Sequence, residues 1–344
     1  MIKKDIYKGK LKEQLKASSK DRLYRFMLSD GMLRGAIVNS TNMVNEMSAN
    51  HNLGYIETLL LGQAYIASSL LTTNLKGNDR ISISIDCSGH LKGIDVESNA
   101  FGEVRGYLKN PNFSDTFSDK KDSFSDKKIS LSSLFGAGFL TVNKYLEDAK
   151  SPYSGKIMLE YGTIAEDLAN YFLKSEQTPT AFNLSVNFDD KINIQSNYSD
   201  IQGQLKPDSK KEQYLDSHLM VDGAGGLFLQ AMPGADSNIV EQAEDIMRNI
   251  KSLGATFAKG ISPDILILEK FNNMSPLLLG NYRVEFFCRC SLKIIRNYIS
   301  RLPKDELIDI SRNGPFPLEV RCHQCNTFYN FTQTDIEEII LLNK

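Results

Sequence analysis

Apolar and polar residues alternate along several short stretches of the first 235 residues, which is the pattern of strands with one buried face. The clearest example is Ile81, Ile83 and Ile85, which are separated by serines. The stretches that we expect to form strands are 33–39, 81–85, 94–100, 102–108, 156–160, 181–188 and the apolar run that follows the glycines at 223–226. The pattern therefore predicts a core that contains sheet.

Three further stretches of the same region repeat apolar residues at intervals of three and four, the spacing of one face of a helix. They span residues 41–47, 55–71 and 163–173. Helices and strands mixed in this way along the chain predict an α+β fold, with a mixed α/β core over residues 1–235.

The helical spacing returns in residues 236–281, for example at Ile239, Ala243, Ile246 and Ile250. This segment is more apolar than a flexible tether, whose side chains stay in water. We therefore expect an apolar helical linker that packs on the core.

Residues 282–344 are predicted to form a small third domain. The expected helices are 292–302, 307–310 and 335–342, and the expected short strands are 318–321 and 328–331. A domain of this size gains little stability from its apolar core alone, so a further stabilising element is expected.

Four of the five cysteines lie in this third domain, in two tight pairs that thirty-one residues separate. Four thiolates that meet at one point suit a tetrahedral zinc ion. Basic residues close to the pairs would favour the deprotonated thiols that zinc requires, and they are Arg289, Lys293, Arg296 and Arg321. We expect one Zn²⁺ per chain, held by Cys288, Cys290, Cys322 and Cys325.

The spacing leaves two roles open for such a site. It could be an inert structural staple that holds a small domain together. Neighbouring thiolates with basic flanks are also easily oxidised, and a disulfide would destroy the ligand set. A metal site of this kind could therefore double as a redox switch.

The C-terminal sequence resembles the redox-regulated heat-shock chaperones of 33 kilodaltons. Cys-x-Cys and Cys-x-x-Cys at this separation match that family's pattern, and residues 287–307 and 329–331 are also similar to it. The core segments that resemble the same family, in the same order, are 34–35, 68–72, 102–107, 110–111, 171–180 and 223–235.

This resemblance implies an ATP-independent chaperone, a holdase that binds unfolding proteins under oxidative stress, and not an enzyme. It implies that the reduced, zinc-bound protein is inactive. Disulfides joining Cys288 to Cys290 and Cys322 to Cys325 would release zinc, unfold the linker and activate the protein. The implied partners are unfolded client proteins and, after oxidation, a second copy of the chain in a homodimer.

Composition and charge limit the partners and the cellular location that we expect. The chain has 344 residues, 41% of them apolar, and a net charge of −2, which gives no basic footprint for nucleic acid. We find no signal peptide and no apolar run long enough to span a bilayer, so we expect no membrane partner and a cytoplasmic location. Thiols are kept reduced there, which favours metal binding over structural disulfides.

Two other functions stay open on the residues alone. A zinc-ribbon nucleic-acid-binding protein would show salt-dependent binding of DNA or RNA. A thiol-disulfide oxidoreductase would reduce insulin catalytically, but its Cys-x-x-Cys should open a helix, whereas Cys322 and Cys325 are predicted to lie in a turn between strands.

Other features carry less weight. Cys87 and His90 flank a glycine turn and lack a third catalytic partner. The polar repeat at 117–130 and the polar stretch at 195–217 are expected to be solvated loops. The glycines at 223–226 lack the signature of a nucleotide site.

Overall fold

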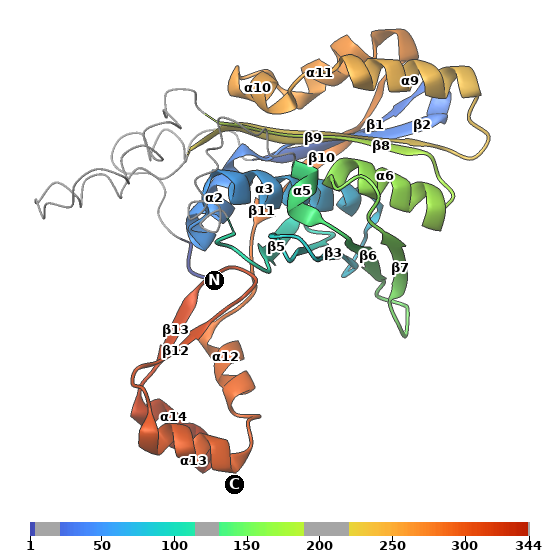
Figure 1. Ribbon diagram of the computed structural model, residues 1–344. Coiled ribbons are helices and arrows are strands. Elements are labelled where there is room, and N and C mark those ends of the chain that lie inside the picture. Colours follow the sequence, from blue (N-terminus) through green and yellow to red (C-terminus); the bar gives the residue numbers. More distant parts are fainter. Residues whose placement is uncertain (4–20, 114–130, 189–219, 343–344) are drawn as a thin grey trace, which may run out of the picture.

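A computed structural model describes residues 1–3, 21–113, 131–188 and 220–342 of the chain (Figure 1). The predicted α+β fold is confirmed, because the described residues form two large sheets, with helices between them and outside them, and a separate two-stranded hairpin. The polar stretches at 117–130 and 195–217 lie outside the described residues.

The first sheet has five antiparallel strands in the order β10-β1-β2-β9-β8. Its strands are β1 (Arg22–Leu28), β2 (Leu33–Asn39), β8 (Thr180–Phe188), β9 (Val221–Ala231) and β10 (Leu277–Arg283). The glycines of β9 let the helix Leu253–Ala258 approach closely, since a Cβ on Gly223 would lie 2.0 Å from the carbonyl oxygen of Gly254. The glycine cluster therefore serves packing in this fold.

The second sheet has six strands in the order β11-β5-β4-β3-β6-β7. Its strands are β3 (Arg80–Cys87), β4 (Gly93–Asn99), β5 (Glu103–Leu108), β6 (Gly138–Tyr145), β7 (Tyr153–Met158) and β11 (Glu285–Phe286). The short strand β11 pairs with β5 in parallel, whereas the other pairs are antiparallel.

Helices α2 (Thr41–His51) and α3 (Tyr55–Leu71) lie between the two sheets (Figure 1). Helix α3 is apolar on nearly all sides, from Leu60 and Leu61 to Leu70 and Leu71, as a fully enclosed helix must be. Helix α6 (Ile164–Ser175) lies beside it, and the Thr163 hydroxyl accepts a hydrogen bond from the Glu166 amide at the start of that helix. Short helix α5 (Leu131–Phe135) adds the buried side chains of Leu134 and Phe135 to the core.

Three helices cover the outer face of the five-stranded sheet: α9 (Ser237–Asn249), α10 (Leu253–Ala258) and α11 (Pro263–Lys270) (Figure 1). Their buried residues, such as Ala243, Phe257 and Ile267, form one cluster with Phe26 and Ile37 of the sheet. The segment expected to be helical and apolar thus packs on the core. The chain then returns to that core, because Leu277–Arg283 forms edge strand β10 against β1.

The C-terminal region extends away from the two sheets (Figure 1). It contains α12 (Leu292–Ile299), α13 (Lys304–Asn313), the hairpin β12 (Leu318–Arg321) and β13 (Phe328–Phe331), and α14 (Gln333–Leu342). Within the described ranges, no helix combines the length and apolar character that a membrane span requires.

Candidate metal centre

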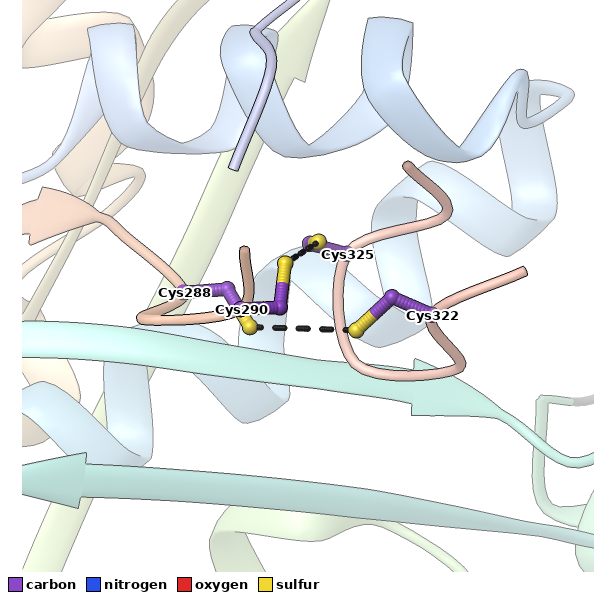
Figure 2. A group of neighbouring side chains, drawn as sticks. All are labelled: Cys288, Cys290, Cys322 and Cys325. Carbon is purple, nitrogen blue, oxygen red and sulfur yellow. Dashed lines mark hydrogen bonds between the residues drawn. The ribbon is translucent and has the colours of Figure 1, made fainter. Parts of the chain in front are cut away.

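The four paired cysteines meet where the C-terminal region joins the core (Figure 2). Cys288 and Cys290 follow strand β11, and Ser291 then starts helix α12 by accepting a hydrogen bond from the Ile294 amide. Cys322 and Cys325 lie in the turn between β12 and β13.

That turn is closed by backbone hydrogen bonds. The Asn326 and Cys325 amides donate to the Cys322 carbonyl at 2.7 and 3.4 Å, and the Cys322 amide donates to Thr327 at 2.9 Å. Asn326 has a φ of 56°, a left-handed conformation that asparagine tolerates better than most residues. The turn therefore holds both thiols of the second pair on the same side.

The sulfur positions fit a metal ion with four thiolate ligands. All four sulfurs lie within 4.8 Å of one another. The Cys288–Cys322 sulfur distance is 3.9 Å and the Cys290–Cys325 distance is 3.3 Å. A tetrahedral site with metal–sulfur bonds of about 2.3 Å has ligand separations of about 3.8 Å. The group could hold a metal ion, and it is the one such group of three or more cysteine, histidine or acidic residues in the described part of the chain.

Hydrogen bonds within the cluster shift the pKa values of three of the thiols. Those with Cys322 and Cys325 lower the pKa of Cys288 far below its usual value. The hydrogen bonds with Cys288 raise the pKa of Cys322 to about 11 and also raise the pKa of Cys325.

Hydroxyl groups contact two of the other sulfurs. The Tyr329 hydroxyl donates to the Cys290 sulfur at 3.2 Å, and the Cys325 sulfur lies 3.3 Å from the Thr327 hydroxyl. Partners of this kind orient ligands around a metal.

The cluster is docked on the core from two sides. On one side, the Gly106 amide of β5 donates to the Gln324 carbonyl at 3.2 Å, and Arg289 forms a two-armed ion pair with Glu103 at 2.8 and 2.9 Å. On the other side, the side-chain amide of Asn50 in α2 donates to the Cys325 carbonyl at 2.6 Å. The Asn326 side chain returns a hydrogen bond to the Asn50 carbonyl at 2.8 Å.

The first residues of the chain also reach the cluster. The Met1 amino group donates to the Cys290 carbonyl at 2.6 Å. The Ile2 amide donates to the Thr327 hydroxyl at 3.3 Å. The cysteine loops are therefore in contact with three separate parts of the core.

Three of the four basic residues that sequence proximity singled out contact other groups. Arg289 pairs with Glu103, Arg296 pairs with Glu338, and Arg321 stacks on Phe328. A guanidinium does reach a sulfur, but it belongs to Arg105 of β5, whose Nη1 lies 3.9 Å from Cys288 Sγ. Arg105 is part of the segment 102–107 that carried the family resemblance, yet no local pattern linked it to Cys288.

Cys87 ends strand β3 and lies outside the cluster. Its pKa is raised, mainly because burial disfavours the thiolate. A Cys87→Ser variant is therefore expected to keep the metal content of the parent and its response to oxidation. Metal analysis and an aggregation assay after peroxide treatment check this, and loss of either property would contradict the four-cysteine assignment.

Comparison with known proteins finds relatives over nearly the whole chain. A sequence model of the family described as Hsp33 protein matches residues 21–332. A 33 kDa chaperonin of Desulforamulus reducens is 32% identical, over 93% of this chain and 97% of the relative. A 33 kDa chaperonin of a Geobacillus species is 28% identical, over 93% of this chain and 97% of the relative.

A solved structure agrees with these matches. The crystal structure of the 33 kDa chaperonin (heat shock protein 33 homolog) of Thermotoga maritima superposes with a TM-score of 0.76 at 27% identity, and the match covers 94% of this chain and 99% of that one. The similarity thus extends over both sheets and the cysteine-bearing region. The chain belongs to the Hsp33 family of chaperones.

Proposed function

We propose that this protein is a redox-regulated holdase, in which Cys288, Cys290, Cys322 and Cys325 hold one Zn²⁺ in the reduced, inactive state. The observation that supports this most is the gathering of four thiols at the joint between core and C-terminal region, in a family of chaperones. When bound, zinc would supply the charge and cross-linking that hold the small C-terminal domain folded.

Oxidation acts on the cysteines themselves. Each disulfide forms when two thiolates give two electrons to a peroxide, which takes up two protons and leaves as two water molecules. We propose disulfides within the pairs, Cys288 to Cys290 and Cys322 to Cys325. The hydrogen bonds that join Cys288 to Cys322 and Cys290 to Cys325 run between the pairs, so peptide mapping of the oxidised protein tests the pairing directly.

Loss of the four zinc ligands would then affect the strands that precede Cys288 in the chain. Phe287 alone separates Cys288 from β11, and Val284 alone separates β11 from β10. A C-terminal region that unfolds therefore withdraws support from both edge strands and, through β10, from helices α9 to α11. Their apolar faces, together with the sheet face that they cover, become available to unfolded clients and to a second subunit.

The deciding experiment compares aggregation of a denatured client with the reduced protein and with the oxidised protein, without ATP. Oxidation by peroxide with mild warming is expected to release about one zinc per chain, raise binding of an apolar dye and suppress aggregation. Equal suppression in both states, with zinc still bound, would contradict the proposed switch.

The oxidoreductase alternative gains no support from the site. Catalysis of thiol exchange needs an accessible thiolate, whereas Cys288, Cys290 and Cys325 are buried. We expect no catalytic reduction of insulin, and this result would distinguish the holdase from an oxidoreductase.

A further inference from the structure

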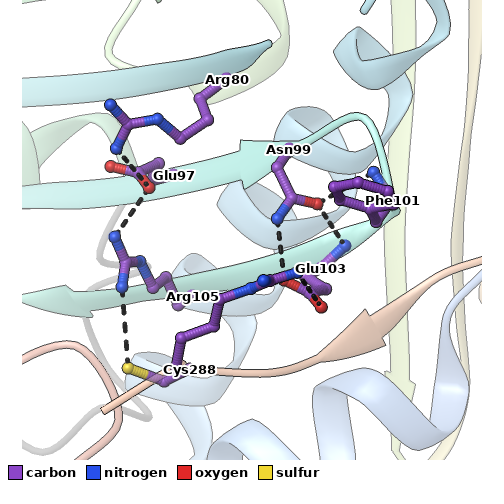
Figure 3. Close-up of polar contacts among 8 residues, drawn as sticks. Arg80, Glu97, Asn99, Phe101, Glu103, Arg105 and Cys288 are labelled. Atoms are coloured by element: carbon purple, nitrogen blue, oxygen red, sulfur yellow. Dashed lines mark hydrogen bonds and ion pairs between the residues drawn. The ribbon is translucent and has the colours of Figure 1, made fainter. Parts of the chain in front are cut away.

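Arg105 links the core to the cysteine cluster through one guanidinium group (Figure 3). Its Nη2 donates to Glu97 Oε1 at 2.8 Å, and its Nη1 lies 3.9 Å from Cys288 Sγ. Arg80 approaches the same Glu97 oxygen at 3.6 Å from the neighbouring strand, and Figure 3 draws no contact between Arg80 and a sulfur. Glu97 thus fixes the guanidinium of Arg105 on β5 in an orientation that reaches the sulfur.

The contact matters because the site carries a net negative charge. Four thiolates around a divalent ion carry a net charge of −2, and only 1% of the Cys288 surface is exposed to water that could solvate that charge. Burying net charge is costly unless an opposite charge lies nearby. The Tyr329 hydroxyl donates a hydrogen bond to the Cys290 sulfur, whereas Arg105 brings a full positive charge to Cys288.

An arginine side chain stays protonated in proteins, so a full positive charge faces the Cys288 sulfur at this distance.

We propose that Arg105 is a positioning residue of the metal centre, whose positive charge offsets the negative charge at the Cys288 sulfur and which holds the first cysteine pair against strand β5. This inference rests on the proposed role of Cys288 as a metal ligand. The inference also predicts how the contact responds to oxidation. Once Cys288 enters a disulfide, its sulfur is neutral, so Arg105 loses its charged partner and the docking on β5 weakens.

The test is a zinc competition titration of the reduced full-length protein against a chromophoric chelator. Arg105→Gln removes the charge, and we expect about 10- to 100-fold weaker zinc binding, the usual effect of losing a partner of a metal ligand. Arg105→Lys keeps the charge without the two-armed geometry, so its affinity should lie between those of the parent and the glutamine variant.

Arg80→Gln is the matched control. It removes a partner of the same Glu97 but leaves the sulfur contact, so zinc affinity should change by less than about fivefold. Glu97→Gln keeps the charge of Arg105 and removes its anchor, and should weaken binding by more than Arg80→Gln does. This variant and Arg105→Lys decide the question if Arg105→Gln does not fold.

Two results would overturn the proposal. One is an Arg105→Gln variant that binds zinc as tightly as Arg80→Gln does. If Arg105→Gln does not fold, the same result for both Arg105→Lys and Glu97→Gln would overturn the proposal. The other is an Arg105→Lys variant as weak as Arg105→Gln, since a role that charge does not rescue is only steric. The titration uses no oxidant and no client, so a failure of the holdase function would leave this result standing.

Discussion

Replacing Cys325 with serine is expected to abolish zinc binding by the reduced protein, unfold its C-terminal region and make it suppress aggregation without any oxidant. Cys325 is fully buried, and its carbonyl accepts the hydrogen bond from Asn50 that ties the second cysteine loop to α2. Structural zinc contributes about 10 kcal/mol or more to the folding of small thiolate domains, which is far more than helices α12 to α14 gain from their short apolar faces.

Hydrogen exchange and metal analysis check this expectation. Amides of α12 and α14 should exchange as fast as in an unfolded chain, while those of β9, in the centre of the five-stranded sheet, should stay protected. Cys87→Ser is the control, because it also removes one thiol but lies outside the cluster. Retention of zinc and of the C-terminal protection in Cys325→Ser would show that three thiols suffice and that the assignment of ligands is wrong.

A Phe271→Ala variant is expected to activate the reduced protein by a different route. Phe271 follows α11, is 1% exposed, and its ring lies 5.7 Å from that of Phe26 in β1. Truncation of a buried phenylalanine costs about 3–5 kcal/mol, and here that loss falls on the contact between the outer helices and the sheet. The reduced, zinc-loaded variant should therefore bind more apolar dye and suppress aggregation in part.

The matched control for this variant is Leu268→Ala in the preceding helix α11. Leu268 is 47% exposed, so its truncation should change the free energy of unfolding by about 0.5 kcal/mol or less. If Phe271→Ala loses stability but remains as inactive as Leu268→Ala, the outer helices do not cover a client-binding surface. Thermal unfolding of both variants, measured beside the aggregation assay, separates these outcomes.

The strands that the sequence predicts well are those with one clean buried face. Ile81, Ile83 and Ile85 alternate because β3 lies in the middle of its sheet over α3. Strand β1 was missed because both of its faces carry apolar residues: Leu23 belongs to the inner hydrophobic cluster, whereas Phe26 and Leu28 belong to the cluster with the outer helices. Strand β10 was missed because three consecutive leucines, 277–279, show no alternation.

Strand β6 and helix α5 were also missed. Strand β7 was placed a few residues late, at 156–160, whereas it spans Tyr153–Met158. Strands at the edge of a sheet have less of a buried face to reveal in the sequence, and β7 is such an edge.

The site was easier to predict than its surroundings. Paired cysteines carry their own signal, because ligand spacing is local within each pair. The partners of the sulfurs come from distant parts of the chain: Arg105 from β5 and Asn50 from α2. Nearby Arg289 instead reaches Glu103. Such contacts follow from how β11 adds to the six-stranded sheet, which no short motif encodes.

The position of β10 has a kinetic consequence. Helices α9 to α11 leave the five-stranded sheet after β9 and re-enter it at β10, so they form a loop that is anchored at both ends and not a free arm. While β10 holds, lifting these helices opens the loop without releasing it, and their high effective concentration favours rapid closure. In the proposed mechanism, a client bound to the exposed sheet face would then compete with the return of these helices to that face.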